Sequence, residues 1–171
     1  IDFVKKISPT FGAVNIEDIE TPKCFEVFER LNEELDIPVF HDDRQGTAVV
    51  CLAGLINALK VVGKKKENVK VVIGGAGAAG FGIMEILLEY GFKNLVLADS
   101  AGIIYKGRKE NMNKYKQKIS EITNKNLQKG NIADALAGAD VLIAATGVVG
   151  EITGEMISSM GKRAIVFALT N

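Results

Sequence analysis

Two pairs of acidic residues follow two short apolar stretches near the start of the chain. Glu17 and Asp18 come after VNI, and Asp42 and Asp43 come after VFH. Carboxylates held close together repel one another and raise one another's pKa values unless a cation lies among them. Carboxylate oxygens are hard ligands that favour Mg²⁺ or Mn²⁺, and such an ion keeps coordination positions for water or substrate oxygens. These residues predict a divalent metal site if the fold brings the two segments together.

The same acids also have a purely structural interpretation. Thr21 and Pro22 form a helix-start signal, with Thr21 in the capping position, and a nearly all-apolar helix is expected from Thr47. Short polar side chains before a helix cap its free N–H groups. Residues 20–21 could therefore cap the first helix, and residues 42–43 could cap the second.

A glycine-rich turn, GAGAAG, follows an aliphatic run that ends at residue 74. Gly75 would supply a tight bend, Gly77 would let the backbone approach a pyrophosphate, and Gly80 would let helix and strand pack closely. The helix that opens at Ala78 and Ala79 would offer free N–H groups and the positive end of its dipole to the phosphates. This order of strand, glycines and helix predicts a dinucleotide site, although glycines of this kind also serve helix–sheet packing alone.

Asp99 ends the next aliphatic run, where a carboxylate accepts hydrogen bonds from the adenine ribose. A carboxylate there would repel a 2′-phosphate, so it favours NAD over NADP. Ser100 and nearby lysines could still accommodate the phosphate, and Asp99 could instead be a helix cap.

Thr146 and Gly147 end the third aliphatic run and Asn171 ends the fourth. Ligands of open parallel sheets bind outside these carboxyl ends. Gly147 would let the backbone pass close to the nicotinamide half, and Asn171 could bind a ribose or a substrate carboxylate. Taken singly, each of these residues could equally be a turn residue.

The four aliphatic runs cover residues 69–75, 93–100, 139–147 and 163–171, and helical or loop segments separate them. Such runs are typical of parallel strands buried on both faces. Their alternation with helices predicts an α/β fold with a doubly wound, mostly parallel, Rossmann-like sheet. Because the chain begins in mid-pattern and ends on a strand, we expect it to be a piece of a longer polypeptide.

The composition of the chain argues against several kinds of binding partner. The chain has 171 residues, and its 21 basic residues are balanced by 21 acidic ones, so we expect neither a nucleic-acid nor a membrane partner. No run of apolar residues reaches the ~18 that are needed to cross a bilayer, and a cytoplasmic protein is expected. Zinc is not expected, because His41 is the single histidine and neither Cys24 nor Cys51 is placed to help.

Five stretches together resemble malic enzyme, most closely its short bacterial and archaeal type: FGAVNIEDI, FHDDRQGTA, GGAGAAGFGI, DSAGIIYKGR and the final LTN. The resemblance implies that Glu17, Asp18 and Asp43 are the metal ligands, and that Asp42 helps to place a catalytic lysine. It puts the glycine turn and Asp99 on the NAD(P) site, and it implies that Asn171 binds malate and the cofactor.

The resemblance further implies oxidative decarboxylation of malate to pyruvate and CO₂ with reduction of NAD(P), by a homodimer or a higher homo-oligomer. Residues 1–45 would be the end of a substrate- and metal-binding domain, and residues 46–171 a truncated NAD(P)-binding domain. The catalytic lysine and tyrosine would lie in a preceding amino-terminal segment, so we expect no malate turnover from this chain alone. Two alternatives are another dehydrogenase, acting on amino acids or shikimate-like substrates, and a non-catalytic nucleotide-sensing domain.

Overall fold

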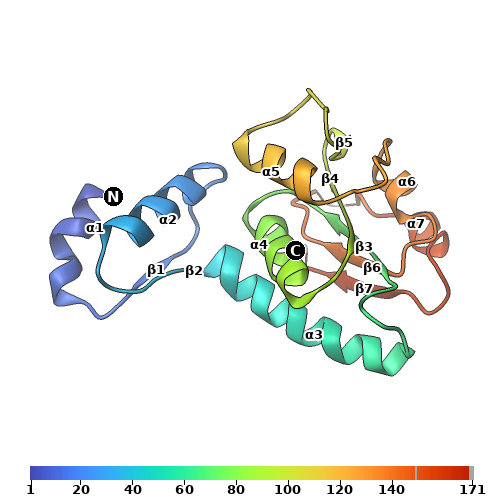
Figure 1. Cartoon of the computed structure of the whole chain (residues 1–171), viewed down its shortest axis with the longest axis horizontal. Helices are drawn as coiled ribbons and strands as arrows, with labels where there is room; N and C mark the ends of the chain where they lie inside the picture. Colours follow the sequence, from blue (N-terminus) through green and yellow to red (C-terminus); the bar gives the residue numbers. More distant parts are fainter. Residues whose placement is uncertain (149, 170–171) are drawn as a thin grey trace.

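The structure, a computed structural model, describes residues 1–148 and 150–169. The chain forms two parts that one short turn connects. The first part is the blue segment on the left of Figure 1. The elements of this first part are α1 (Asp2–Ile7), the 3₁₀ turn η1 (Ser8–Thr10), β1 (Val14–Ile16), α2 (Lys23–Glu34) and β2 (Val39–His41).

The two short strands of the first part, β1 and β2, pair in parallel. Val14 lies opposite Val39, and Ile16 lies opposite His41. Because the strands run in the same direction and end in register, the acidic residues that follow them leave the sheet at the same edge.

The turn between the two parts is η2 (Asp42–Gly46), one stretch of π-helix that leads directly into α3 (Thr47–Val62). α3 buries one face, which includes Cys51 and Leu55, and leaves other apolar side chains exposed. The span Asp42–Val62 has 21 residues, and its most apolar stretch of 18 residues has a mean hydropathy of 1.6 and is 22% buried. It is therefore long and apolar enough to cross a membrane by length and composition, a test that core helices of soluble proteins also pass. The nearly all-apolar helix expected from Thr47 is therefore confirmed as α3.

The second part is a five-stranded sheet in the order β5-β4-β3-β6-β7, over the residues that the structure describes. Its strands are β3 (Lys70–Gly74), β4 (Asn94–Asp99), β5 (Gly102–Ile103), β6 (Val141–Ala144) and β7 (Ile165–Ala168). Neighbouring pairs among β4, β3, β6 and β7 are parallel, while the two-residue β5 is antiparallel to β4. The predicted mostly parallel sheet is confirmed, and β5 is an addition that the sequence analysis missed.

Helices cover both faces of this sheet, and they are α4 (Ala78–Tyr90), α5 (Lys114–Ile122), α6 (Ile132–Leu136) and α7 (Gly154–Ser158) together with α3. Alternate residues of β3 point to opposite faces: Val71 and Ile73 join the core formed with α3, α4 and α5, whereas Val72 joins the core formed with α6 and α7. The fold is therefore doubly wound.

The first part is docked on the second through aromatic side chains. Phe25 of α2 is 1% exposed and belongs to the same core cluster as Phe81 of α4 and Tyr115 of α5. The ring centroid of Phe25 lies 5.2 Å from that of Phe81 and 4.2 Å from that of Tyr115. This packing fixes how the acidic edge of the first part faces the glycine turn of the second.

Candidate functional site

The glycine turn between β3 and α4 needs glycine for two different reasons. Gly75 has φ +105°, and a Cβ there would lie 2.4 Å from the Ala145 carbonyl oxygen. A Cβ at Gly80 would lie 2.0 Å from the Gly75 carbonyl oxygen, so only glycine lets α4 pack this closely on the turn. At Gly77 the nearest atom to an added Cβ is Thr21 Oγ1 at 3.8 Å, so this position borders open space instead.

The space beside Gly77 is a cleft of about 460 Å³ at the carboxyl ends of the strands. The predicted residues that line it are Gly75, Gly77, Asp99, Thr146 and Gly147. Gly80 is buried beneath the turn, and Ala78 and Ala79 form the first turn of α4. The cleft and the helix N-terminus together have the shape and polarity that a dinucleotide pyrophosphate requires.

The other residues of the cleft were not predicted as part of the site, except that Ser100 and nearby lysines were expected to accommodate a 2′-phosphate. The further lining residues are Thr21, Pro22, Ala76, Ser100, Asn111, Asn113, Lys116, Ala145, Val148 and Glu151. Thr21 is the one that sequence reasoning misassigned, because α2 begins after Pro22 and has no side-chain cap. The prediction of Thr21 as a helix cap is wrong, and the residue instead closes the cleft from the first part of the chain.

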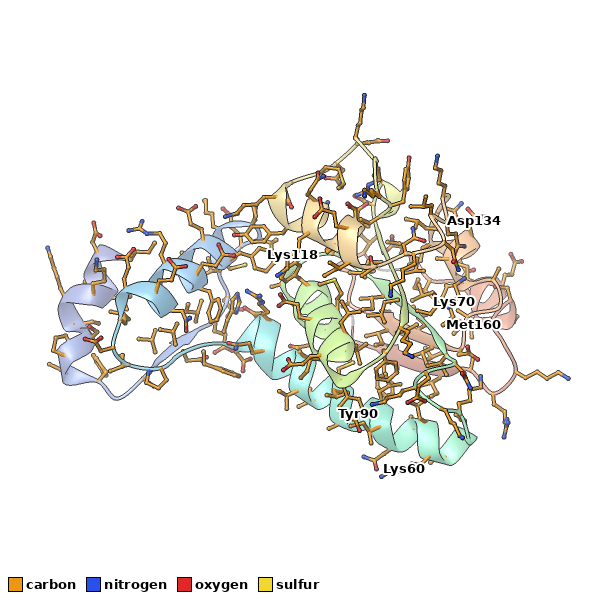
Figure 2. All side chains as sticks on the ribbon, in the orientation of Figure 1. Lys60, Lys70, Tyr90, Lys118, Asp134 and Met160 are labelled. Atoms are coloured by element: carbon orange, nitrogen blue, oxygen red, sulfur yellow. The ribbon has the colours of Figure 1, made fainter. Side chains whose placement is uncertain are left out.

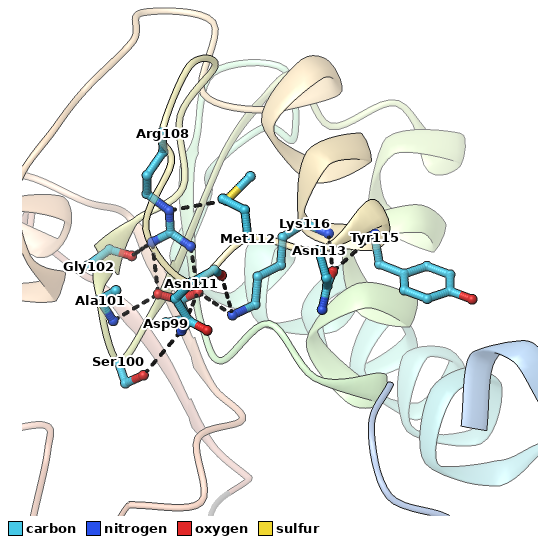
Figure 3. Close-up of polar contacts among 10 residues, drawn as sticks. All are labelled: Asp99, Ser100, Ala101, Gly102, Arg108, Asn111, Met112, Asn113, Tyr115 and Lys116. Atoms are coloured by element: carbon cyan, nitrogen blue, oxygen red, sulfur yellow. Dashed lines mark hydrogen bonds and ion pairs between the residues drawn. The ribbon is translucent and has the colours of Figure 1, made fainter. Parts of the chain in front are cut away.

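Asp99 is held by two cations and is not a free carboxylate (Figure 3). Arg108 donates from Nη1 to Oδ1 at 2.8 Å and from Nη2 to Oδ2 at 2.6 Å. Lys116 Nζ lies 2.7 Å from Oδ2, and the Ala101 N–H donates to Oδ1 at 2.9 Å. The Asp99 side chain is 8% exposed and that of Arg108 is 4% exposed.

These contacts set the charge at this end of the cleft. Burial would by itself raise the pKa of Asp99, but the hydrogen bonds from Arg108, Lys116 and the Ala101 N–H together hold it below its usual range. One anion faces two cations, so the cluster carries a net positive charge. NAD was predicted because the Asp99 carboxylate would repel the 2′-phosphate of NADP. The positive charges of Arg108 and Lys116 offset that repulsion.

The acids at the ends of β1 and β2 meet through one hydrogen bond. The Asp18 N–H donates to Asp43 Oδ2 at 3.0 Å, and Asp18 adopts a left-handed φ of +57° to do so. The first turn of α3 is preceded by Gly46, and neither α2 nor α3 has a side-chain cap, so the capping interpretation is not supported at either helix. Within residues 1–148 and 150–169, no three His, Cys, Asp or Glu side chains are grouped as metal ligands.

The chemistry of the predicted ligands nevertheless suits a hard cation. Glu17, Asp18 and Asp43 all offer carboxylate oxygens at one edge of the small sheet, and the first two are exposed enough to turn. An ion would need to draw the side chains of Glu17 and Asp18 toward Asp43. The half-buried Asp42 packs within the turn itself, with Oδ1 2.7 Å from where a Cβ of Gly46 would be.

Asp43 also faces a second cavity, of about 360 Å³. The residues that line it are Asp43, Thr47, Ala79, Ala145, Thr146, Gly147 and Leu169. Ala145, Thr146 and Gly147 line both cavities. A continuous lining therefore connects the glycine turn with the acidic edge.

His41 is fully buried beside these acids, with Nδ1 4.0 Å from Asp43 Oδ2. Burial lowers its pKa, and neither ring nitrogen has a hydrogen-bond partner among the described residues. Asn171, predicted to bind the cofactor and the substrate, lies outside the described residues.

Comparison with known proteins identifies the family to which the chain is similar. A family model described as malic enzyme, NAD binding domain, matches residues 44–171. The whole chain is 48% identical over 171 residues to a bifunctional malic/malolactic enzyme of Bacillus subtilis, of which it covers 42%. It is 41% identical over 173 residues to an NADP-dependent malic enzyme of Haemophilus influenzae, of which it covers 22%.

A solved structure shows the same fold. The crystal structure of an NAD-dependent malic enzyme from Thermotoga maritima has a TM-score of 0.95 and 46% identity, and the match covers 99% of this chain and 45% of that one. The chain thus spans less than half the length of these relatives. It belongs to the malic enzyme family, and residues 44–171 match that family's NAD binding domain.

Proposed function

We propose that this chain is the nucleotide- and metal-binding portion of an enzyme that oxidises malate to pyruvate and CO₂ and reduces NAD(P). The observation that carries the proposal is the shared lining of the two cavities by Ala145, Thr146 and Gly147. A nicotinamide that enters along the glycine turn would reach the cavity of Asp43. A substrate chelated there would be next to the hydride acceptor.

In this proposal, backbone N–H groups bind the cofactor and carboxylate side chains bind the metal ion. The N–H groups at Ala78 and Ala79 bind the pyrophosphate, and Gly77 leaves room for it. Glu17, Asp18 and Asp43 would hold Mg²⁺ or Mn²⁺, which when bound supplies a Lewis acid for the oxygens of malate. The three carboxylates fix where that charge lies, and the buried aromatic contact with α2 keeps the acidic edge facing the cleft.

Other roles belong to the same proposal. Asp42 would orient the catalytic lysine, which would lie with the catalytic tyrosine in an amino-terminal segment outside this chain. Asn171 would bind malate and the nicotinamide ribose. We also propose a cytoplasmic protein that works as a homodimer or a higher homo-oligomer.

NAD is the proposed cofactor, and NADP is a possible second one. The pairing of Asp99 with Arg108 and Lys116 gives the ribose end of the cleft a net positive charge, which a 2′-phosphate would complement. The Asp99 carboxylate oxygens can still accept from a ribose hydroxyl at the cleft surface.

The test is calorimetric titration of the chain with NAD and with NADP, each with and without Mn²⁺. We expect binding of at least one nucleotide and a separate Mn²⁺ site that Asp43→Asn weakens. Asp36→Asn, an exposed acid before β2, is the matched control that should leave both affinities unchanged. A folded chain that binds neither nucleotide contradicts the proposal.

Activity separates the alternatives. The chain alone should bind its cofactor without oxidising malate, and an enzyme that also contains the amino-terminal segment should reduce NAD(P) with malate and Mn²⁺. A dehydrogenase for another substrate would not need Glu17, Asp18 and Asp43. A nucleotide-sensing domain would bind the cofactor and transfer no hydride with malate in either form.

A further inference from the structure

Arg44 follows Asp43 directly in η2, and its side chain leaves the turn in the direction of α4. Arg44 Nη2 lies 2.5 Å and Nε lies 3.2 Å from Oε2 of Glu85, which is on α4. The Arg44 side chain is 13% exposed and that of Glu85 is 30% exposed, so this ion pair is partly buried. Lys118 of α5, labelled in Figure 2, lies 3.0 Å from the other Glu85 oxygen.

The same guanidinium packs against aromatic rings from both parts of the chain. Its Cζ lies 5.6 Å from the ring centroid of Phe25 and 5.2 Å from that of Phe28, both on α2. It lies 4.9 Å from that of Phe81 on α4. A guanidinium at such distances is attracted to the ring faces. Arg44 is therefore in contact with the first part, the turn and the second part at once.

The main chain of Arg44 is clamped as well. A Cβ at Gly82 would lie 2.1 Å from the Arg44 carbonyl oxygen, so α4 packs directly on the backbone of the turn. α4 is the helix whose N-terminus forms the glycine turn. The position of Asp43 relative to the pyrophosphate site therefore depends on the contacts between Arg44 and α4.

We propose that Arg44 is a positioning residue, which fixes η2 against α4 so that the Asp43 carboxylate faces the cavity beside Thr146. The inference rests on the proposed function, because it assigns Asp43 a cation to bind. No contact of Arg44 with substrate or cofactor is involved. Its effect passes through the ion pair with Glu85 and the three rings, which restrict the turn before any ligand arrives.

Three variants test the inference: Arg44→Gln, Glu85→Gln and the double variant. Two quantities are measured in each, namely the Mn²⁺ dissociation constant, from the electron paramagnetic resonance signal of free Mn²⁺, and amide hydrogen exchange of residues 42–47. We expect each single variant to weaken Mn²⁺ binding about 10-fold, as is common when the group that orients a metal ligand is removed. The double variant should be no weaker than the singles, because both remove the same contact.

Exchange separates positioning from loss of the fold. In the folded single variants, amides 42–47 should exchange faster while those of β3 stay protected. Arg44→Lys keeps the charge without the forked contact and should recover part of the Mn²⁺ affinity. Arg30→Gln is the matched control, because Arg30 pairs with Glu34 at 2.8 Å on an exposed side of α2.

The outcomes are distinguishable. Wild-type Mn²⁺ affinity and exchange in the folded Arg44 and Glu85 variants would overturn the inference and leave the proposed function standing. An equal loss in Arg30→Gln would also overturn it. If the wild-type chain binds no Mn²⁺, the metal part of the proposed function fails, and the positioning role fails with it.

Discussion

The pairing of Lys116 with Asp99 gives a prediction at the scale of single residues. Lys116→Gln removes one of two cations at the ribose end of the cleft but leaves Arg108 in place. A hydrogen bond from a charged donor is worth about 1.5–3 kcal/mol, so NADP affinity should fall about 10-fold or more while NAD affinity changes little. Titration with both nucleotides measures this.

Lys118→Gln is the control for that change. Lys118 lies on the same helix, but it pairs with Glu85 away from the cleft. It should leave the ratio of the two affinities unchanged. An equal loss for NAD and NADP in Lys116→Gln would show that Lys116 does not discriminate between them.

His41 predicts a pH dependence of stability. It is the single histidine of the chain, and burial lowers its pKa. In the unfolded chain a histidine takes up a proton near pH 6.5, whereas buried His41 resists protonation until the pH is lower. The unfolded state therefore binds more protons below about pH 6.5, and the free energy of unfolding should decrease as the pH falls through this range.

Denaturant unfolding between pH 7.5 and 5.5 measures that decrease. His41→Leu should flatten the curve over this window, because the carboxylates whose pKa values are lowered, such as Asp99, lose their contribution only at more acidic pH. An unchanged pH dependence in His41→Leu would contradict the role given to His41.

Spacing along the chain was enough to predict the residues that act through the backbone. Gly75, Gly77 and Gly80 could be identified from sequence because the turn itself dictates their order. Arg108 could not, because it reaches Asp99 after an irregular loop that includes left-handed backbone at Gly107. Such a loop has no period from which a contact could be read.

At the scale of elements, the two glycines that flank Ala78 and Ala79 should fail in different ways. Gly80→Ala places a Cβ 2.0 Å from a backbone oxygen and should cost about 2 kcal/mol of stability, as overpacking does. Gly77→Ala meets no atom closer than 3.8 Å and should keep its stability. Its methyl group would occupy the cleft, so nucleotide affinity should fall.

Thermal unfolding and nucleotide titration of both variants separate the two effects. A stable Gly80→Ala variant with full nucleotide affinity would show that α4 can retreat from the turn at no cost. A Gly77→Ala variant with wild-type affinity would place the pyrophosphate elsewhere.

The strands and helices were predicted where a regular pattern runs long enough to be recognised. The runs that became β3, β4, β6 and β7 are aliphatic on both faces, which is typical of strands between two layers of helices. β5 was missed because two residues carry no pattern. The π-helical turn η2 was missed because its residues suggested a ligand site and a helix cap, not a helix of their own.

At the scale of the whole molecule, none of the described residues 1–148 and 150–169 covers the outward face of α3. Its exposed residues recur at helical spacing and are Val49, Val50, Ala53, Gly54, Asn57, Lys60 and Val61. Val50 is 67% exposed and Val61 is 86% exposed. Contiguous apolar surface of this kind binds other apolar groups. We therefore expect the isolated chain to bind the dye 8-anilinonaphthalene-1-sulfonate while it is folded.

The double variant Val50→Ser, Val61→Ser should reduce that dye fluorescence and change stability by no more than about 0.5 kcal/mol, because neither side chain is buried. Leu55→Ala, on the buried face of the same helix, should instead cost about 3 kcal/mol and leave the dye signal of the folded protein unchanged. Fluorescence titration with parallel thermal unfolding makes the comparison. If the double variant binds the dye as well as wild type does, the dye binds elsewhere on the molecule, and the exposed face of α3 is not the dye-binding surface.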